Sequence, residues 1–293
     1  IGEDAGYRRQ VYNGQDCPLN NCDFSSGTPI TLGSPDNATG IDFNLNAAGA
    51  ITGTISDVNG ILPDWSGRAR IADASGRTLI QVYTDENGVY FAGGLEPGTY
   101  YGLGTGRNST LIDELWDGFA TPGVHCPRQS CDYPSNGKPI VINTNETVSG
   151  VDLELDAGSR ISGTISIDGN PPGYAEIYFY DGDGDYAAYG ITDEAGNYQS
   201  ASGFPAGTWY ASNRFVADGA EQPFWQNLLP TMYNSADQDG TDCGYPCDLA
   251  GTIVGGTASP ISTDGSTDTG INNYNYISQP QAAISGTLFA ADG

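Results

Sequence analysis

TDENGVYFAGGLEPGTYY, residues 84 to 101, is the stretch that decides the fold, because it recurs as TDEAGNYQSASGFPAGTWY at residues 192 to 210. Asp85 and Asp193 open the copies, and a Gly follows each after three positions. Asp side chains hold the backbone of a turn and Gly accepts positive φ, so this pattern predicts a turn leading into a Tyr-containing strand. A second turn with Pro and Gly leads into another aromatic strand. The sequence therefore predicts an all-β module with a period of roughly 110 residues.

The composition favours the same fold class. A length of 293 residues allows about two domains of this kind. The chain has 42 Gly, 17 Pro and 18 Tyr with only 16% charged residues, which is typical of many short strands joined by turns and unlike a helix bundle. It contains no apolar run long enough for a transmembrane helix, so we expect no membrane span in this segment.

The chain is strongly acidic. Ten Lys and Arg stand against 36 Asp and Glu, giving a formal net charge of −26. A nucleic-acid-binding protein needs a basic surface that contacts phosphates, so this charge excludes nucleic acid as a partner. Solvation and mutual repulsion between copies are one interpretation of the charge, and a salt-rich habitat or a requirement for divalent cations are the others.

Six cysteines form three close pairs, each at the same place in its repeat: Cys17 and Cys22, Cys126 and Cys131, and Cys243 and Cys247. Their even number, local spacing and recurrence predict short-loop disulfides in an oxidising compartment. Zinc binding by these thiolates is the alternative. It would need four ligands, the chain has one His, and the pairs would have to converge from different repeats.

Strands that close one repeat and open the next set the predicted domain boundaries. Opening strands begin with AITGTIS at residue 50, RISGTIS at residue 160 and AISGTLF at residue 283, and the closing strands include GIDFNL at residues 40 to 45. We predict four parts: residues 1–47 as the C-terminal part of a preceding repeat, 48–157 as a complete β-sandwich, 158–280 as a second one with an insertion near 213–243, and 281–293 as the first strand of a further repeat.

The partial repeats predict a window of a longer array, continued covalently or by strand exchange between copies. In the second case an edge strand would add to the sheet of a neighbour. The candidate assembly strand comprises Ile284, Ser285, Gly286, Thr287, Leu288 and Phe289.

Together, the IxGTI opening strand, TDENGxY and LxPGTYY resemble the carboxypeptidase regulatory-like and Cna-B-like repeats of bacterial secreted or surface proteins, which share a transthyretin-like β-sandwich. The resemblance implies tandem Ig-like antiparallel sandwiches that act as spacers, stalks, adhesin segments or accessories to enzymes. Cna-B domains often carry a Lys to Asn crosslink. Lys138 is the only Lys here, with Thr28 and Ser259 at its positions in the other repeats, so that crosslink cannot recur.

Catalytic chemistry finds little support in the sequence. A zinc carboxypeptidase needs two His and a Glu, whereas His125 is the only His. His125 lies beside Cys126, and its copies are Asp16 and Asp242, so we do not expect a recurring catalytic triad. We predict no enzyme activity and no required cofactor.

Two further sites remain open. Asp181, Asp183 and Asp185 have the alternating oxygens that calcium prefers, although an EF-hand would need Gly and Glu where Tyr186 and Thr192 stand. The alternative is an acidic hairpin tip. Some aromatic side chains could stack on surface glycans, while alternate ones must be core. The predicted core residues are Ile51, Ile55, Tyr90, Tyr100, Ile161, Ile165, Tyr198 and Trp209.

The repeats, local staples and acidic surface together predict a structural segment of an extracellular fibre, filament or cell-surface stalk or adhesin, with further copies or adjacent repeats as partners. The alternative is a carbohydrate-binding or accessory module of a secreted hydrolase. Glycosylation of Asn37, Asn108 or Asn145, which match the acceptor pattern, is left open.

Overall fold

The computed structural model of the chain divides into two compact units, Ile1–Gly158 and Ser159–Gly293. Each unit is described by itself. The structure describes residues 6–17, 22–34, 37–62, 67–106, 109–119, 123–126, 131–167, 169–172, 175–214, 231–236, 241–242, 249–266 and 269–276.

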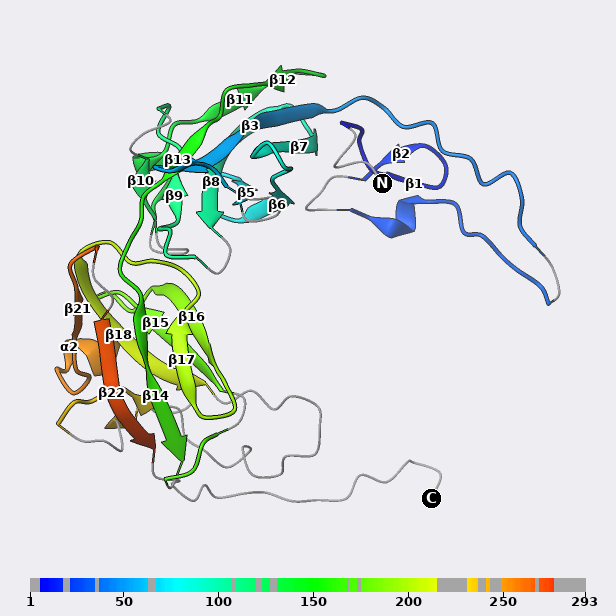
Figure 1. The fold of residues 1–293 in the computed structure, drawn as a ribbon. Coiled ribbons are helices and arrows are strands. Elements are labelled where there is room, and N and C mark those ends of the chain that lie inside the picture. Colours follow the sequence, from blue (N-terminus) through cyan, green and yellow to red (C-terminus); the bar gives the residue numbers. More distant parts are fainter. Residues whose placement is uncertain are drawn as a thin grey trace, which may run out of the picture. The chain divides into compact units, whose positions relative to one another are not determined.

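The first unit contains a small sheet built around its opening strand (Figure 1). β3 (Gly49–Asp57) pairs antiparallel with β7 (Val89–Leu95) and β4 (Gly60–Ile61). On its other side it pairs in parallel with β12 (Thr147–Val148) and then β13 (Leu153–Leu155). The closing strand therefore returns alongside the opening one.

The other sheet of the first unit has the order β10-β9-β8-β5-β6, with β11 also paired to β8. All of these pairs are antiparallel. Its strands are β5 (Gly67–Ala72), β6 (Thr78–Tyr83), β8 (Gly98–Gly106), β9 (Glu114–Leu115), β10 (Val124–His125) and β11 (Ile140–Ile142).

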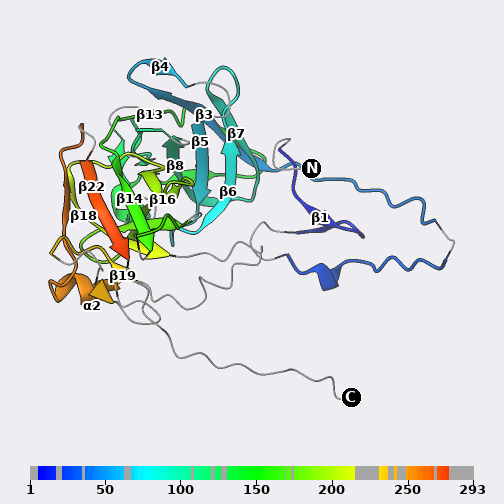
Figure 2. The same ribbon diagram turned by 60° about the horizontal axis from the view of Figure 1, so that its bottom comes forward.

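The second unit repeats this connectivity in one continuous sheet. Its order is β20-β19-β18-β15-β16-β17-β14-β22, with β21 paired to β18. β14 pairs with β17 antiparallel and with β22 in parallel, as β3 pairs with β7 and with β12 and β13; β14 and β22 lie side by side in Figures 1 and 2. The strands are β14 (Ile161–Ile167), β15 (Glu176–Tyr180), β16 (Tyr186–Thr192), β17 (Asn197–Ser200), β18 (Gly207–Arg214), β19 (Thr231–Met232), β20 (Thr241–Asp242), β21 (Ile261–Thr263) and β22 (Thr269–Tyr276).

The repeated turn has the expected chemistry in both units. The Asp85 carboxylate accepts the backbone N–H groups of Asn87 and Val89, both at 2.9 Å. Asp193 does the same for the second unit. Gly88 has φ +72°, a left-handed conformation that a side chain would strain.

Each unit has its own hydrophobic core, and all eight predicted core residues are buried. Polar groups of the large core side chains have hydrogen-bond partners inside the protein. The Tyr90 hydroxyl donates to the carbonyl of Val151 at 2.7 Å, and the indole N–H of Trp209 donates to the Thr263 hydroxyl at 2.9 Å. Burying a side chain of this size contributes about 1.5 to 3 kcal/mol, and the internal partner avoids an unpaired polar group.

The all-β prediction is confirmed, with three differences. The closing strands pair in parallel with the opening strands, so the sandwiches are not wholly antiparallel. The predicted strand at residues 40–45 is wrong, because that segment forms no ladder pairing. Short helical turns also occur: η2 (Phe24–Ser26), α1 (Tyr133–Asn136) and α2 (Leu249–Val254). Among the described residues, no helix is both long and apolar enough to cross a membrane.

Candidate functional site

A disulfide-stapled segment recurs along the chain, and we call it the stapled module. Each copy has a short hairpin, a cysteine pair and a helical turn. Copy 1 spans residues 6–48, copy 2 residues 110–158, and the described part of copy 3 lies within residues 231–263. One backbone N–H···O bond recurs in all three, from Thr28 to Tyr12, from Lys138 to Trp116 and from Ser259 to Tyr233, at 2.8, 2.9 and 2.8 Å.

The predicted staples are present wherever the structure describes them. Disulfides join Cys17 to Cys22 in copy 1 and Cys126 to Cys131 in copy 2, and the described residues include no free cysteine. The third pair, Cys243 and Cys247, lies outside the described residues and stays a prediction.

The β9–β10 pair, the disulfide and α1 of copy 2 contribute to a second buried cluster, separate from the main core of the first unit. Tyr133, the first residue of α1, packs its ring edge-on against that of Tyr101 in β8, with 6.4 Å between the ring centroids. Asp132 caps the helix, since its carboxylate accepts the N–H of Ser135. The buried members of this cluster are Ala72, Tyr101, Leu103, Leu115, Cys126 and Tyr133.

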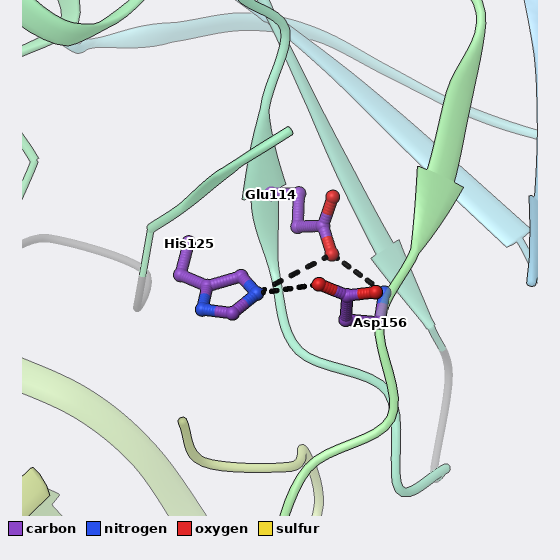
Figure 3. A group of neighbouring side chains, drawn as sticks. All are labelled: Glu114, His125 and Asp156. Carbon is purple, nitrogen blue, oxygen red and sulfur yellow. Dashed lines mark hydrogen bonds and ion pairs between the residues drawn. The ribbon is translucent and has the colours of Figure 1, made fainter. Parts of the chain in front are cut away.

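Three polar side chains converge at the edge of copy 2: Glu114, His125 and Asp156 (Figure 3). Glu114 and His125 are directly opposite one another in the β9–β10 pair, and Asp156 follows β13. His125 Nε2 lies 2.9 Å from Asp156 Oδ2 and 3.9 Å from Glu114 Oε1. The Glu114 side chain is wholly buried, whereas those of His125 and Asp156 are 37% and 50% exposed.

Burial raises the pKa of Glu114 to about 7, and the nearby Asp156 carboxylate adds to the shift. Three groups oppose it: the backbone N–H of Asp156, 2.5 Å from Oε1, the backbone N–H of Gly123, 3.1 Å from Oε2, and His125. Near neutral pH this carboxyl is poised between its two protonation states. One imidazole nitrogen and two carboxylate oxygens also form a donor set that divalent transition metals accept.

Copy 1 places Gln10, Asp16 and Asn46 where copy 2 has Glu114, His125 and Asp156. The correspondence follows from matching backbone bonds: Arg8 N–H donates to Asn46 at 2.8 Å, and Ile112 N–H to Asp156 at 2.9 Å. The Asp16 carboxylate accepts from the Gln10 and Asn46 amides at 3.4 and 3.1 Å, and Arg8 Nη1 pairs with it at 3.0 Å. Partial burial opposes these contacts, but together they lower the pKa of Asp16.

The predicted calcium residues form the tip of the β15–β16 hairpin. The Asp181 carboxylate accepts the backbone N–H groups of Asp183 and Asp185 at 3.0 and 2.9 Å. Within the described residues, the three His, Cys, Asp or Glu side chains whose ligand atoms all lie within 4.8 Å of one another are Glu114, His125 and Asp156. The hairpin-tip arrangement is therefore present, and calcium binding there stays a prediction.

The other predicted features fall partly or wholly outside the described residues. This applies to the assembly strand at residues 284–289 and to most of the insertion, at residues 215–230. Sequence reasoning considered His125 but missed Glu114 and Asp156 as its neighbours. His125 stands directly before Cys126 in the sequence, and the three cysteine pairs can be aligned with one another. That alignment does not show that β9 pairs with β10, or that the chain returns to them after β13.

No family model matches the chain, and neither does any curated protein. Several solved structures are similar at low TM-scores, between 0.26 and 0.28 for the three named here. They include the Bacillus anthracis TIE protein (TM-score 0.27, 14% identity, 81% of this chain and 34% of that one). The Streptococcus agalactiae minor pilin GBS52 has TM-score 0.28 and 10% identity, covering 82% and 100%. The shaft pilin SpaA of Lactobacillus rhamnosus GG has TM-score 0.26 and 9% identity, covering 81% and 99%. This chain spans about a third of the TIE protein.

Proposed function

We propose that this chain is a structural repeat segment of an extracellular fibre or cell-surface stalk, with no catalytic role. The observation that carries the proposal is the recurrence of the stapled module, with the same backbone bond in three places along the chain. Copies 1 and 2 each have a short-range disulfide, and the two units share one strand connectivity. A load-bearing rod needs a repeated, self-contained unit, whereas an enzyme needs one unit that differs in chemistry.

The staples and the charge support an extracellular location. Disulfides persist in oxidising compartments, and copies 1 and 2 each have one. A net charge of −26 keeps neighbouring molecules apart through repulsion and favours solvation. The partners in this proposal are further copies of the chain or adjacent repeats.

The cluster of Glu114, His125 and Asp156 does not argue for hydrolysis by itself. It has no hydroxyl or thiol nucleophile among its members, and the neighbouring Cys126 is oxidised in a disulfide. A serine-type or cysteine-type mechanism requires an activated hydroxyl or thiol within hydrogen-bond reach of the base. We therefore place the cluster outside the proposed function.

Electron microscopy of the protein in its natural assembly tests the proposal. We expect beaded rods with an axial repeat of roughly 35 to 45 Å, about the length of one sandwich. Reduction with dithiothreitol should loosen the beads without dissolving the rod if the staples act locally. Discrete globular particles dominated by one large catalytic domain would contradict the proposal.

A tyrosine face on the second unit favours a glycan-binding function as the second candidate. The rings of Tyr178 and Tyr180 lie 5.5 and 6.3 Å from that of Tyr186, and all three are half-buried. In the first unit the position of Tyr178 is taken by Arg70, which is buried. Aromatic faces of this kind can stack on sugars. A glycan array with the wild-type chain and a Tyr178→Ala, Tyr186→Ala variant tests it: binding lost in the variant supports this candidate, and no binding by either protein rejects it.

A further inference from the structure

We propose that Glu114, His125 and Asp156 bind one divalent transition-metal cation of the zinc type, which ties β9 and β10 to the segment that follows β13. This site goes beyond the structural role proposed for the chain. It is formed by the one His in the sequence and by two carboxylates. Along the chain, Asp156 lies 31 residues from His125 and 42 residues from Glu114.

The geometry of the three donors suits such an ion. Ligands of a tetrahedral zinc ion lie roughly 3.3 Å apart, given metal–ligand distances of about 2.0 to 2.1 Å. Here His125 Nε2 is 2.9 Å from Asp156 Oδ2 and 3.9 Å from Glu114 Oε1, and all three donor atoms lie within 4.8 Å of one another. The two separations that involve His125 therefore lie within about 0.6 Å of the spacing that a tetrahedral zinc ion needs, one below it and one above it.

The backbone already orients these ligands. Glu114 and His125 are cross-strand partners in the β9–β10 pair, and the N–H of Ile112 fixes the carbonyl of Asp156 at 2.9 Å. The N–H groups of Asp156 and Gly123 each hold one oxygen of the Glu114 carboxylate. Each carboxylate oxygen has a second lone pair, so these bonds leave capacity for a metal. Hydrogen bonds of this kind are the usual outer support of metal-ligating carboxylates.

Among the residues that the structure describes, the cluster has more acidic groups than basic ones. Two carboxylates, those of Glu114 and Asp156, lie beside the single imidazole of His125, at 3.9 and 2.9 Å from its Nε2. Copy 1 shows the alternative. It has one carboxylate, Asp16, and that carboxylate is neutralised by Arg8 at 3.0 Å; copy 2 has Ile112 in place of this Arg and acidic groups in place of the two amides.

The donor types select the metal class. Magnesium and calcium prefer all-oxygen ligands, whereas imidazole nitrogen favours zinc and its neighbours among the transition metals. Both cysteines of copy 2 are in a disulfide, so thiolate does not compete. Three protein ligands leave a position for water, and the exposure of His125 and Asp156 gives water and metal access. Bound metal would brace the end of the closing strand against the hairpin.

Calorimetric titration of zinc chloride into the untagged, EDTA-stripped chain tests this site. We expect one equivalent bound with a dissociation constant on the order of 1 μM, and little competition from millimolar calcium or magnesium. His125→Gln and Asp156→Asn should each weaken binding by at least about 100-fold, since changes to residues that only support the ligands already cost about 10- to 100-fold. Both side chains are partly exposed, so these variants should fold, as circular dichroism would verify.

Matched controls in the same chain separate this site from general acidity. Asp16→Asn, at the position of His125 in copy 1, and Asp181→Asn, at the hairpin tip, should leave zinc affinity unchanged. Zinc should also raise the unfolding midpoint of the wild-type chain by about 5 to 10 °C at a hundredfold excess over the dissociation constant, but not that of His125→Gln. Absence of binding, or binding that survives both His125→Gln and Asp156→Asn, would overturn the proposal.

Discussion

Copies 1 and 2 of the stapled module have the same backbone bonds but different surroundings. In copy 2, Leu115 and Cys126 are wholly buried in the second buried cluster. In copy 1, Val11 stands where copy 2 has Leu115 and is only half-buried, and no residue of the described part of copy 1 joins a buried hydrophobic cluster. The module's form is therefore set by local hydrogen bonds and the staple, while its contribution to stability depends on the sheet beneath it.

The same comparison explains the difference in polar chemistry. Copy 1 keeps one carboxylate beside an Arg in a partly exposed setting, where an ion pair costs little desolvation. Copy 2 buries Glu114 against its own sheet, and burial penalises the charged form. The buried carboxyl of Glu114 can therefore bind either a proton or a cation.

The largest difference between the copies should appear when their equivalent apolar residues are truncated. Leu115→Ala should lower the free energy of unfolding of the first unit by about 3 to 4 kcal/mol, because it opens a cavity in a fully buried cluster. Val11→Ala should cost less than about 1 kcal/mol. Urea denaturation followed by tryptophan fluorescence would measure both, and equal losses would contradict the asymmetry between the copies.

Glu114→Gln tests the electrostatic side of the comparison in metal-free protein. The folded carboxyl keeps its proton up to a pKa of about 7, whereas the ordinary value is 4.5. Stability contributed by this proton is therefore full below pH 4.5 and lost as pH rises through 7. Wild type should lose about 2 to 3 kcal/mol of unfolding free energy over that range relative to the variant. Denaturation curves in EDTA from pH 4 to 8 would show this, and parallel profiles would refute the burial argument.

The fold was largely predictable from the sequence because its signals are local. The TDENG turn and the alternating strands gave the strand positions and core residues such as Tyr90 and Trp209, both of which are buried. Which strands pair with one another depends on segments that lie far apart in the sequence, so strand pairing was harder to predict. Residues 40–45 have the alternation of a strand but form no ladder in the structure, since a strand also needs a neighbour with free backbone groups.

The polar cluster was predictable only in part. The copies of His125 could be aligned through the cysteines, and that alignment correctly placed Asp16. It could not reveal that Glu114 faces His125, because β9 and β10 are strands of only two residues each, and residues 116–123 separate them in the sequence. Nor could it show that the chain returns after β13 to place Asp156 beside both. Three segments meet there, and only tertiary structure brings them together.

Removing a staple should have a smaller effect than the core truncation. Converting Cys126 and Cys131 to Ala frees a loop with a sequence separation of 5, which should cost the first unit about 2 kcal/mol by loop entropy. The same change at Cys17 and Cys22 should leave the sandwich transition of that unit unchanged. Differential scanning calorimetry of both double variants would separate these outcomes, and a sandwich transition lowered equally by both would show that copy 1 also stabilises the sandwich.

The smallest effect should come from the helix caps. Asp132 caps α1 through the N–H of Ser135, and Asp23 caps η2 through the N–H of Ser25 at 2.9 Å. Removing a capping carboxylate costs about 1 kcal/mol of helix stability. Because Tyr133 of α1 is buried in the second buried cluster, Asp132→Ala should lower the midpoint of the first unit by a few degrees. Asp23→Ala should leave it unchanged, since Phe24 of η2 is 80% exposed.

Thermal unfolding of the two single variants would measure this difference. Asn in place of either Asp keeps an oxygen acceptor and should restore the wild-type value. If Asp132→Ala had no effect while Leu115→Ala did, the second buried cluster would be held by β9 and the disulfide, and α1 would only cover it.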